Sequence, residues 1–455
     1  MNIINPATEE IIATLEPDNK ASALHKYELL KKSFHSWRQT KLTERIDIMK
    51  NYASILEKNI EACACILTTE VGKPLQQSRN EIKGAIQRIL WLCDNAPAVY
   101  RQEWMRQDAS FKEYIDYEPL GTICNISAWN YPYLVGINVY VPALLAGNTV
   151  AYKPSEYALL SGLQMQKLLY SAGLPENVFQ VIVGDKHIGE ELLNLNFDGY
   201  FFTGSYSTGK YIYEKVAYKM VPCQLELGGK DPLYVADDVS DITSVARSAA
   251  DGAFYNNGQS CCSVERIYVH ENIYEPFLHE FIQEVASYKI GLPTEQGVYI
   301  GPLTRRAQIP FLEEQIQDAL NKGAKIMLGG KRIDRKGYYF EPTVLVEVNH
   351  EMRIMREESF GPVIGIMKVK DDEHAIELMN DTEYGLTGSV YSANIERAQH
   401  IFSKLNTGTV YWNCCDRVSP ALPWSGRKHS GIGSTLSFAG LRAFVQPKAF
   451  HLKPA

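Results

Sequence analysis

Short β-rich runs alternate with helical stretches over the middle of this chain, and this alternation constrains the fold more than any other feature. Strand-like runs occupy residues 122–127, 149–153, 179–183, 200–203 and 224–227. Helical patterns separate them, such as 158–171, which ends at Gly173 with Pro175 just beyond. Because parallel strands need a crossover between them, usually a helix, the alternation predicts a parallel, doubly wound sheet.

A second alternating series follows the first. Strand-like residues 232–236 and 265–270 each precede a helical pattern, at 241–254 and 273–288. A chain of 455 residues is too long for one hydrophobic core. We therefore predict two α/β units in series, each large enough to hold a core of its own.

Two regions depart from this alternation. Residues 19–100 have a helical pattern, and we expect one apolar face there to include Ile82, Ile86, Ile89, Leu90 and Cys93. Residues 111–118 alternate apolar with charged side chains, which is typical of an exposed hairpin or arm.

Composition narrows the class of protein. With 45% apolar and 22% charged residues the chain is ordinarily globular, and its net charge of −7 gives no general attraction for nucleic acid or anionic lipid. We therefore expect neither nucleic acid nor membrane as a partner. The apolar stretch 131–151 is interrupted by Pro132 and Pro142, which does not fit a membrane span.

The cysteines and the amino terminus suggest a compartment. Nine cysteines are an odd number, and the first residues lack a signal-peptide pattern, so we expect reduced thiols in the cytoplasm. Cys63 and Cys65 lie two residues apart on a helix and point in different directions, so we expect no metal site.

Residues 254–262, Phe-Tyr-Asn-Asn-Gly-Gln-Ser-Cys-Cys, place cysteines where a helical pattern breaks at a glycine just before a strand. A loop between rigid elements can expose a nucleophile such as Cys261 to substrate. On the pattern alone, a buried structural thiol is the commoner role for such a residue.

Residues 225–230, Leu-Glu-Leu-Gly-Gly-Lys, put Glu226 between two leucines at the end of an apolar strand. Burial would raise the pKa of this carboxyl, which suits a group that takes up a proton near neutral pH. A surface glutamate on an edge strand fits the same pattern equally well.

Three further motifs are weak when taken singly. Phe-Thr-Gly-Ser at 202–205 indicates a strand, a glycine turn and a helix start, whose amides can hold a pyrophosphate. The dinucleotide fingerprint with three glycines is not present there. Trp-Asn-Tyr-Pro at 129–132 and Lys-Pro-Ser-Glu at 153–156 are each consistent with a turn or a helix cap.

The joint order of these motifs resembles the aldehyde dehydrogenase superfamily along nearly the whole chain. The similarity begins at Asn-Pro-Ala-Thr (5–8) and extends to Glu-Glu-Ser-Phe-Gly-Pro (357–362) and Pro-Trp-Ser-Gly-Arg-Lys-His-Ser-Gly (423–431). It implies NAD-dependent oxidation of an aldehyde to a carboxylic acid, by the hydrolytic type with a catalytic cysteine.

The resemblance also implies an α/β architecture of two doubly wound domains and a small β oligomerisation arm. A Rossmann-like, NAD-binding domain would take residues 1–101 and 120–227, and the catalytic domain residues 228–429. The arm would take residues 102–119 and 430–455. Similar segments in the family pair with a neighbouring subunit, so we expect a homodimer or homotetramer.

Three catalytic roles follow from the resemblance. Cys261 matches the nucleophile, which forms a thiohemiacetal and then a thioester with the aldehyde. Asn130, with the backbone N–H of Cys261, matches the donors to the oxyanion, and a neutral amide can donate without becoming a competing acid. Glu226 matches the general base that activates the hydrolytic water.

The resemblance also marks a cofactor site. The matching positions are Trp129, Lys153, Glu156, Gly204, Ser205, Glu358 and Phe360. A carboxylate at Glu156 would accept hydrogen bonds from both adenosine-ribose hydroxyls and would repel the 2′-phosphate of NADP. We therefore expect NAD as the cofactor, with NADP as the alternative.

The resemblance implies a small aldehyde as substrate, but it does not define which acyl group that aldehyde carries. The positions that match the family's tunnel are Tyr131, Val135, Asn138, Cys262, Val418 and Trp424. They are mostly neutral, which predicts a medium aliphatic or aromatic aldehyde. An arginine turned inward, such as Arg417, would instead favour a succinate-semialdehyde-type dehydrogenase.

Two other functions are alternatives. Enzymes of this fold that pass the acyl group to coenzyme A typically lack the glutamate base, and a non-catalytic homologue usually lacks the cysteine, glutamate or asparagine. Cys261, Glu226 and Asn130 are all present, which favours the hydrolytic reaction. Trp424 and Ser425 stand where the family often has Phe-Gly, a departure that concerns the substrate entrance.

Overall fold

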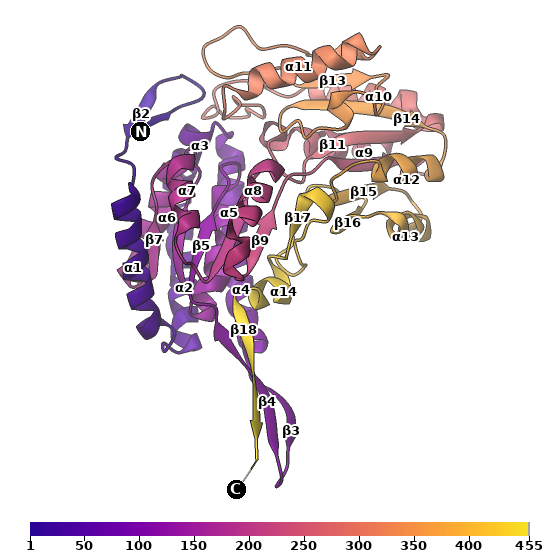
Figure 1. Cartoon of the computed structure of the whole chain (residues 1–455). Helices are drawn as coiled ribbons and strands as arrows, with labels where there is room; N and C mark the ends of the chain where they lie inside the picture. Colours follow the sequence, from indigo (N-terminus) through magenta and orange to yellow (C-terminus); the bar gives the residue numbers. More distant parts are fainter. Residues whose placement is uncertain (454–455) are drawn as a thin grey trace.

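Two α/β units and a projecting arm make up the computed structural model, which describes residues 1–453 (Figure 1). The first unit has a six-stranded sheet in the order β17 (Gly431–Ile432), β9 (Cys223–Glu226), β8 (Gly199–Thr203), β5 (Thr122–Ile126), β6 (Thr149–Lys153) and β7 (Phe179–Val181). All neighbours are parallel except the edge strand β17.

The second unit has a seven-stranded sheet. Its order is β12 (Lys325–Leu328), β13 (Thr343–Val346), β14 (Val363–Val369), β11 (Val264–His270), β10 (Asp231–Val235), β15 (Thr387–Tyr391) and β16 (Thr409–Trp412). Only the edge strand β12 runs antiparallel to its neighbour. The prediction of an α/β fold with two doubly wound domains is confirmed.

Helices cover both sheets. Those of the first unit are α1 (Lys20–Trp37), α2 (Leu42–Lys58), α3 (Ile60–Val71), α4 (Leu75–Val99), α5 (Pro132–Ala146), α6 (Leu159–Ser171), α7 (Lys186–Asn194), α8 (Tyr206–Val216) and α14 (Ser437–Arg442). Those of the second are α9 (Ile242–Phe254), α10 (Tyr274–Ala286), α11 (Gln308–Asn321), α12 (Asp372–Asn380) and α13 (Ile395–Lys404). Because helices shield both faces, strands such as β6 and β10 are buried at every position.

The apolar stretch at 131–151 is a buried helix and strand. In α5, Pro132 occupies the first turn, where its missing N–H costs nothing, and Gly147 ends the helix with a φ of +99°. No helix within residues 1–453 combines the length and the apolar character needed to cross a bilayer.

The buried face of α4 differs in part from the predicted one. Ile82, Ile89 and Cys93 are buried, but Leu90 is 39% exposed and the prediction for it was wrong. Arg88, a charged residue, takes a buried place on this face instead. Over a helix of 25 residues the apolar positions drift around the axis, so spacing alone did not fix the face.

The arm is a three-stranded antiparallel sheet that projects from the first unit (Figure 1). Its strands are β3 (Glu103–Gln107), β4 (Lys112–Pro119) and β18 (Val445–Leu452), with β4 in the middle. The carboxy-terminal range expected for the arm divides in two, since β17 pairs with β9 and α14 packs against α4. A two-stranded sheet of β1 (Asn2–Ile4) and β2 (Ile11–Thr14) lies near the amino terminus.

Candidate active site

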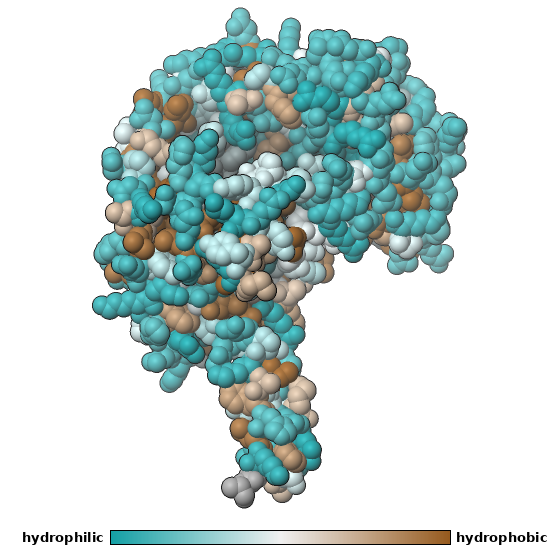
Figure 2. Space-filling view, in the orientation of Figure 1, coloured by the Kyte–Doolittle hydropathy of each residue, from teal (hydrophilic) through white to brown (hydrophobic). Residues whose placement is uncertain are grey.

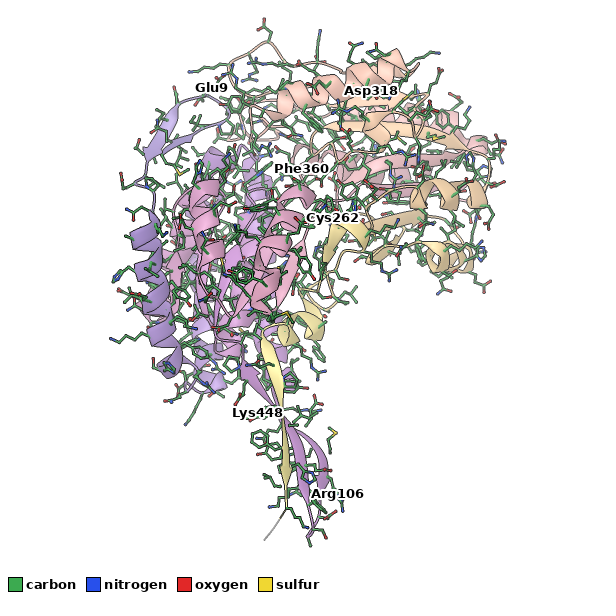
Figure 3. All side chains as sticks on the ribbon, in the orientation of Figure 1. Glu9, Arg106, Cys262, Asp318, Phe360 and Lys448 are labelled. Carbon is green, nitrogen blue, oxygen red and sulfur yellow. The ribbon has the colours of Figure 1, made fainter. Side chains whose placement is uncertain are left out.

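A cavity of about 810 Å³ opens between the two α/β units. Cofactor and ligand sites typically have volumes of ~300–1,000 Å³, so this space has the size of a binding site. Of the residues singled out in the sequence, it is lined by Trp129, Asn130, Tyr131, Val135, Lys153, Glu156, Gly204, Ser205, Glu226, Cys261, Glu358 and Phe360. Figure 3 shows Phe360 and Cys262, from the second unit, where the two units meet.

The topology of the six-stranded sheet explains why several of these segments meet. The chain passes from β5 to β6 and β7 on one side, and then returns to β8 and β9 on the other. Loops that leave the carboxyl ends of β5 and β8 diverge at this reversal, which is the usual ligand site of an open α/β sheet. The loop after β5 carries Trp129 and Asn130, and the loop after β8 carries Gly204 and Ser205.

The loop that carries Cys261 has an unusual backbone fixed by amide side chains. Asn256, Asn257 and Gly258 have φ angles of +53°, +57° and +67°. Asparagine and glycine tolerate this left-handed region better than other residues do. Asn257 Nδ2 donates to the carbonyls of Gly301 and Pro302, at 2.9 and 2.8 Å, so the turn is tied to a neighbouring loop.

A buried ion pair fixes the loop that carries Asn130. Lys73 Nζ donates to the carboxylate of Glu81 and, at 2.7 Å, to the backbone carbonyl of Asn130. The other oxygen of Glu81 accepts the Tyr133 N–H at 2.9 Å. Lys73 Nζ also lies 3.6 Å from the centre of the Tyr131 ring. Both side chains of the pair are fully buried, so Lys73, between α3 and α4, and Glu81, on α4, hold the loop at several points.

This anchoring leaves two donors near the nucleophile. The Asn130 side chain is 4% exposed, and its Nδ2 donates to the Gln259 carbonyl at 3.0 Å. An amide NH₂ has two hydrogens, so a second one remains for another acceptor. The backbone N–H of Cys261 makes no hydrogen bond within the described chain. Both groups can therefore donate to an oxygen that develops negative charge beside Cys261.

Glu226 ends β9 and lines the same cavity as Cys261. Burial raises the pKa of Glu226 to about 7, although a hydrogen bond from Thr435 and the charge of Arg88 act in the opposite direction. A carboxyl group with a pKa near neutrality can take a proton from water and release it again at physiological pH. The edge-strand surface role that the sequence left open for Glu226 does not apply.

The two glycines after Glu226 let three segments approach closely. A Cβ atom at Gly228 would lie 2.4 Å from the Glu358 carboxylate, and one at Gly229 would lie 2.9 Å from the Cys261 carbonyl oxygen. Gly229 N–H donates to Glu358 at 3.0 Å. Any larger residue at these positions would push apart the segments that carry Glu226, Cys261 and Glu358.

Phe360 is held in a strained conformation at the cavity wall. Its φ is +47°, which is rare for a residue other than glycine. Its N–H donates to Glu265 at 3.0 Å, and its ring lies edge-on to Trp129 with centroids 5.5 Å apart. Glu265 is in turn paired with buried Lys230 at 2.6 Å, so the surroundings compensate for the strain.

The opposite end of the cavity is suited to a dinucleotide. Lys153 ends β6 and is buried, and the half-buried Glu156 accepts a hydrogen bond from Ser155 at 3.1 Å. Ser205 stands at the cap position of α8, so the free N–H groups of that helix point toward the cavity. Exposed amides at a helix start favour a phosphate group. The residues present therefore fit a nicotinamide dinucleotide.

Four predicted substrate residues lie behind the cavity wall. Buried Cys262 and Trp424 form a small apolar cluster with Leu386 and Leu436, against which Cys261 and Val418 pack. The Cys262 thiol donates to Asp416 at 2.9 Å. Asn138 is also buried, and its Oδ1 accepts a hydrogen bond from Arg88 at 2.8 Å.

Several residues of the site were not found from the sequence. They are Lys73, Glu81, Arg88, Asp416 and Thr435. Each acts through a contact with a residue far away in the chain, such as the pair of Thr435 with Glu226, 209 residues apart. Charge on a buried helix face was the one available signal, and on α4 both Glu81 and Arg88 carry it.

Comparisons with known proteins point to one family. The family model described as "Aldehyde dehydrogenase family" matches residues 1–450. A succinate-semialdehyde dehydrogenase (NADP+) from Deinococcus radiodurans is 31% identical, over 99% of this chain and 94% of that protein. A peroxisomal aminoaldehyde dehydrogenase 1 from Pisum sativum is 33% identical, over 98% and 91%.

Solved structures also match the fold over nearly the whole chain. The crystal structure of an E. coli NADP-dependent enzyme superposes with a TM-score of 0.97 at 30% identity, covering 100% of this chain and 94% of that one. Betaine aldehyde dehydrogenase from Staphylococcus aureus in complex with NAD+ gives 0.96 at 31% identity, covering 100% and 92%. The chain belongs to the aldehyde dehydrogenase family of oxidoreductases, as the order of its motifs predicted.

Proposed function

We propose that this protein oxidises an aldehyde to the carboxylic acid through a covalent thioester on Cys261, with NAD as the preferred cofactor. The observation that supports this most strongly is the convergence of Cys261, Asn130 and Glu226 on one cavity, from three separate segments. The other end of the same cavity offers Lys153, Glu156 and the start of α8 to a dinucleotide.

In the acylation half of the reaction, the Cys261 thiolate attacks the aldehyde carbonyl carbon. The carbonyl oxygen becomes an alkoxide, which accepts hydrogen bonds from Asn130 Nδ2 and from the backbone N–H of Cys261. Bound NAD supplies the hydride acceptor for the former aldehyde carbon, which is thereby oxidised by two electrons. The alkoxide collapses to the carbonyl of a thioester on Cys261.

In the deacylation half, water attacks the thioester and Glu226 takes its proton. The carbon–sulfur bond then breaks, the acid leaves, and the Cys261 sulfur is freed for the next turnover. Hydrolysis in place of transfer to coenzyme A is supported by the presence of Glu226 in the cavity.

The test is initial-rate formation of NADH or NADPH with a panel of aldehydes, with and without coenzyme A. We expect reduced cofactor and free acid in the absence of coenzyme A. Turnover that required coenzyme A would indicate the acylating reaction, and no turnover with any aldehyde would indicate a non-catalytic protein.

We also propose that the arm joins subunits into a dimer or tetramer. Its outer strands β3 and β18 leave backbone edges unpaired within residues 1–453. Trp104 and Met105 on β3 are 46% and 61% exposed, and apolar patches are visible along the arm in Figure 2. Exposed edges and apolar side chains are usually covered by a partner. Light scattering that showed a monomer at micromolar concentration would contradict this assembly.

A further inference from the structure

Arg88 is a buried cation beside the active site. The residue is 7% exposed and belongs to α4, on the face that packs against α5. Its Nη1 donates to Asn138 Oδ1 at 2.8 Å and to the Leu134 carbonyl at 3.4 Å, both on α5. These contacts fix the guanidinium group against one side of that helix.

No carboxylate within residues 1–453 forms an ion pair with Arg88. Buried charges in proteins are normally paired, because desolvation of an isolated charge is costly. The two nearby glutamates have other partners, since Glu81 is bonded to Lys73 and Glu226 to Thr435. Arginine stays protonated in proteins, so the guanidinium is a cation without a matching anion.

Two nitrogens of the guanidinium are unused. Nε and Nη2 donate to no atom of the described residues. A polar atom with no partner and no accessible surface would be a buried unsatisfied atom, and neither nitrogen is one of these. Both nitrogens therefore retain some accessible surface. The side-by-side N–H groups of a guanidinium match the two oxygens of a carboxylate.

Arg88 does not line the cavity itself but lies behind its wall, next to Asn138. Val135 lines the cavity, and Asn138 follows it by one turn on the same face of α5. The charges of Glu226, Cys262 and Cys261 all act on the pKa of Arg88, which burial lowers. Arg88 therefore lies within electrostatic range of both the nucleophile and the base.

We propose that Arg88, oriented by Asn138, binds the carboxylate of a substrate that carries an aldehyde at its other end. The substrate class is thus an ω-oxo carboxylic acid, or semialdehyde, rather than a neutral aldehyde. This inference rests on the proposed oxidation at Cys261 and adds a specificity residue from α4. The earlier expectation of a neutral acyl group considered tunnel positions on other segments, and Arg88 was not among them.

The same charge disfavours cationic aldehydes. A protonated amino group brought to Arg88 would meet a like charge with little water to screen it. Asp416 is a half-buried carboxylate, and it is already hydrogen-bonded to Cys262 at 2.9 Å. An aminoaldehyde would therefore lose its hydration at this site without gaining a free anionic partner.

The experiment compares three aldehydes in the full-length native protein and in two Arg88 variants. The aldehydes are an ω-oxo acid such as succinate semialdehyde, its neutral methyl ester, and an aminoaldehyde of similar length. We expect native kcat/KM to be highest for the oxo acid. Arg88→Met should lower that value by about 100-fold, the loss typical of a charged hydrogen-bonded contact. The ester value should fall by much less, because the ester loses only the effect of the Arg88 charge on Glu226. Arg88→Lys should retain part of the preference.

Arg79→Met is the matched control. Arg79 is on the same helix, but it is paired with Glu61 at the surface, so all three values should stay at native levels. Arg417→Met tests the exposed arginine beside Asp416 and should also leave the oxo-acid preference intact. Thermal unfolding and NAD titration show whether each variant is folded.

Three results would overturn the proposal. They are a native enzyme that prefers the ester or the aminoaldehyde, equal losses for ester and oxo acid in Arg88→Met, and loss of the preference in Arg417→Met. If Arg88→Met fails to fold, the native preference and Arg88→Lys still decide the matter. Failure of the proposed reaction itself would differ, because then no aldehyde would reduce the cofactor.

Discussion

The two α/β units face the shared cavity with opposite ends of their strands. The six-stranded sheet presents carboxyl ends, where Lys153 closes β6 and Glu226 closes β9. The seven-stranded sheet presents amino ends, since Cys261 comes just before β11 and Phe360 just before β14. At the carboxyl ends of the six-stranded sheet, helices begin beside the cavity, so their free backbone amides face a ligand. At the amino ends of the seven-stranded sheet, side chains reach the cavity from loops whose shape is set by their own hydrogen bonds.

The comparison suggests that binding and chemistry are divided between the two units, with the nucleophile on the second. Cys261→Ser should sharpen this division. We expect kcat/KM to fall by more than about 10⁴-fold, because a hydroxyl cannot replace the thiolate nucleophile. Cofactor binding, measured by titration calorimetry, should be unchanged because Cys261 is not among the residues proposed to contact the dinucleotide.

Cys262→Ser is the control for the nucleophile. It should keep most of the activity, since a hydroxyl can still donate to Asp416 as the Cys262 thiol does at 2.9 Å. If the Cys262 variant were inactive and the Cys261 variant active, the nucleophile would be Cys262 and not Cys261.

Glu226 is an exception to this division, because it ends a strand of the first unit and is yet proposed to act as the general base. Glu226→Gln should give one burst of NADH per active site and then a steady rate that is lower by about 10²–10⁴-fold, the usual contribution of a general base. Stopped-flow absorbance measures both phases. Steady turnover at the native rate would remove Glu226 from this role.

The pH dependence provides a second check on Glu226. Its carboxylate form is needed to accept a proton, and burial raises its pKa to about 7. The native deacylation rate should therefore decrease as the pH falls through 7, and this decrease should disappear in Glu226→Gln.

Lys73 and Glu81 also belong to the first unit, and they act on the chemistry through Asn130. The double variant Lys73→Met/Glu81→Gln removes both charges together, which avoids leaving one buried charge alone. Loss of the contact to the Asn130 carbonyl should lower kcat by about 10- to 100-fold through misplacement of the oxyanion donor. Cofactor affinity should not change.

The exposed pair Arg79–Glu61 supplies the control for this double variant. Arg79→Met/Glu61→Gln removes an ion pair between α4 and α3, near the first pair in the chain but at the surface, where such pairs contribute little. We expect native kcat. Equal losses in both double variants would point to general destabilisation instead of an effect on Asn130.

A substitution of Glu156 tests cofactor binding alone, and its expected effect is the smallest. Glu156→Ser should raise the ratio of kcat/KM for NADP over NAD by about 10-fold, because repulsion of roughly 1.4 kcal/mol toward the 2′-phosphate is removed. Buried Lys153 nearby offsets part of the repulsion in the native protein. A native preference for NADP, or an unchanged ratio in the variant, would contradict the argument.

The sequence predicted the parts of the site that lie within continuous motifs. Cys261, Glu226 and the segment around Asn130 each stand in a recognisable run, so local pattern and motif order made them candidates, and the structure brings all three to one cavity. The contacts that tune these groups could not be predicted in this way. Thr435 and Arg88 influence Glu226 from 209 and 138 positions away in the chain, and no local pattern encodes such distances.

The fold followed the same rule. Strands such as β6 and β10 were predicted because their buried residues are consecutive, whereas the inward face of α4 depends on what packs against it. Leu90 and Arg88 exchanged the places that hydrophobicity alone would assign to them. The apolar pattern did not reveal the buried Arg88, and the proposal about the substrate rests on this residue.

The arm places a condition on the synthesis of this protein. His451 on β18 bonds Glu113 on β4 across a separation of 338 residues, so the sheet cannot close until β18 has left the ribosome. Both α/β units precede β18 and can begin to fold during translation, since domains generally fold as units. A chain that terminates early would then have two largely formed units and an unfinished arm. Synthesis of β18 would thus separate two kinds of product, because only copies that include this strand carry a closed arm.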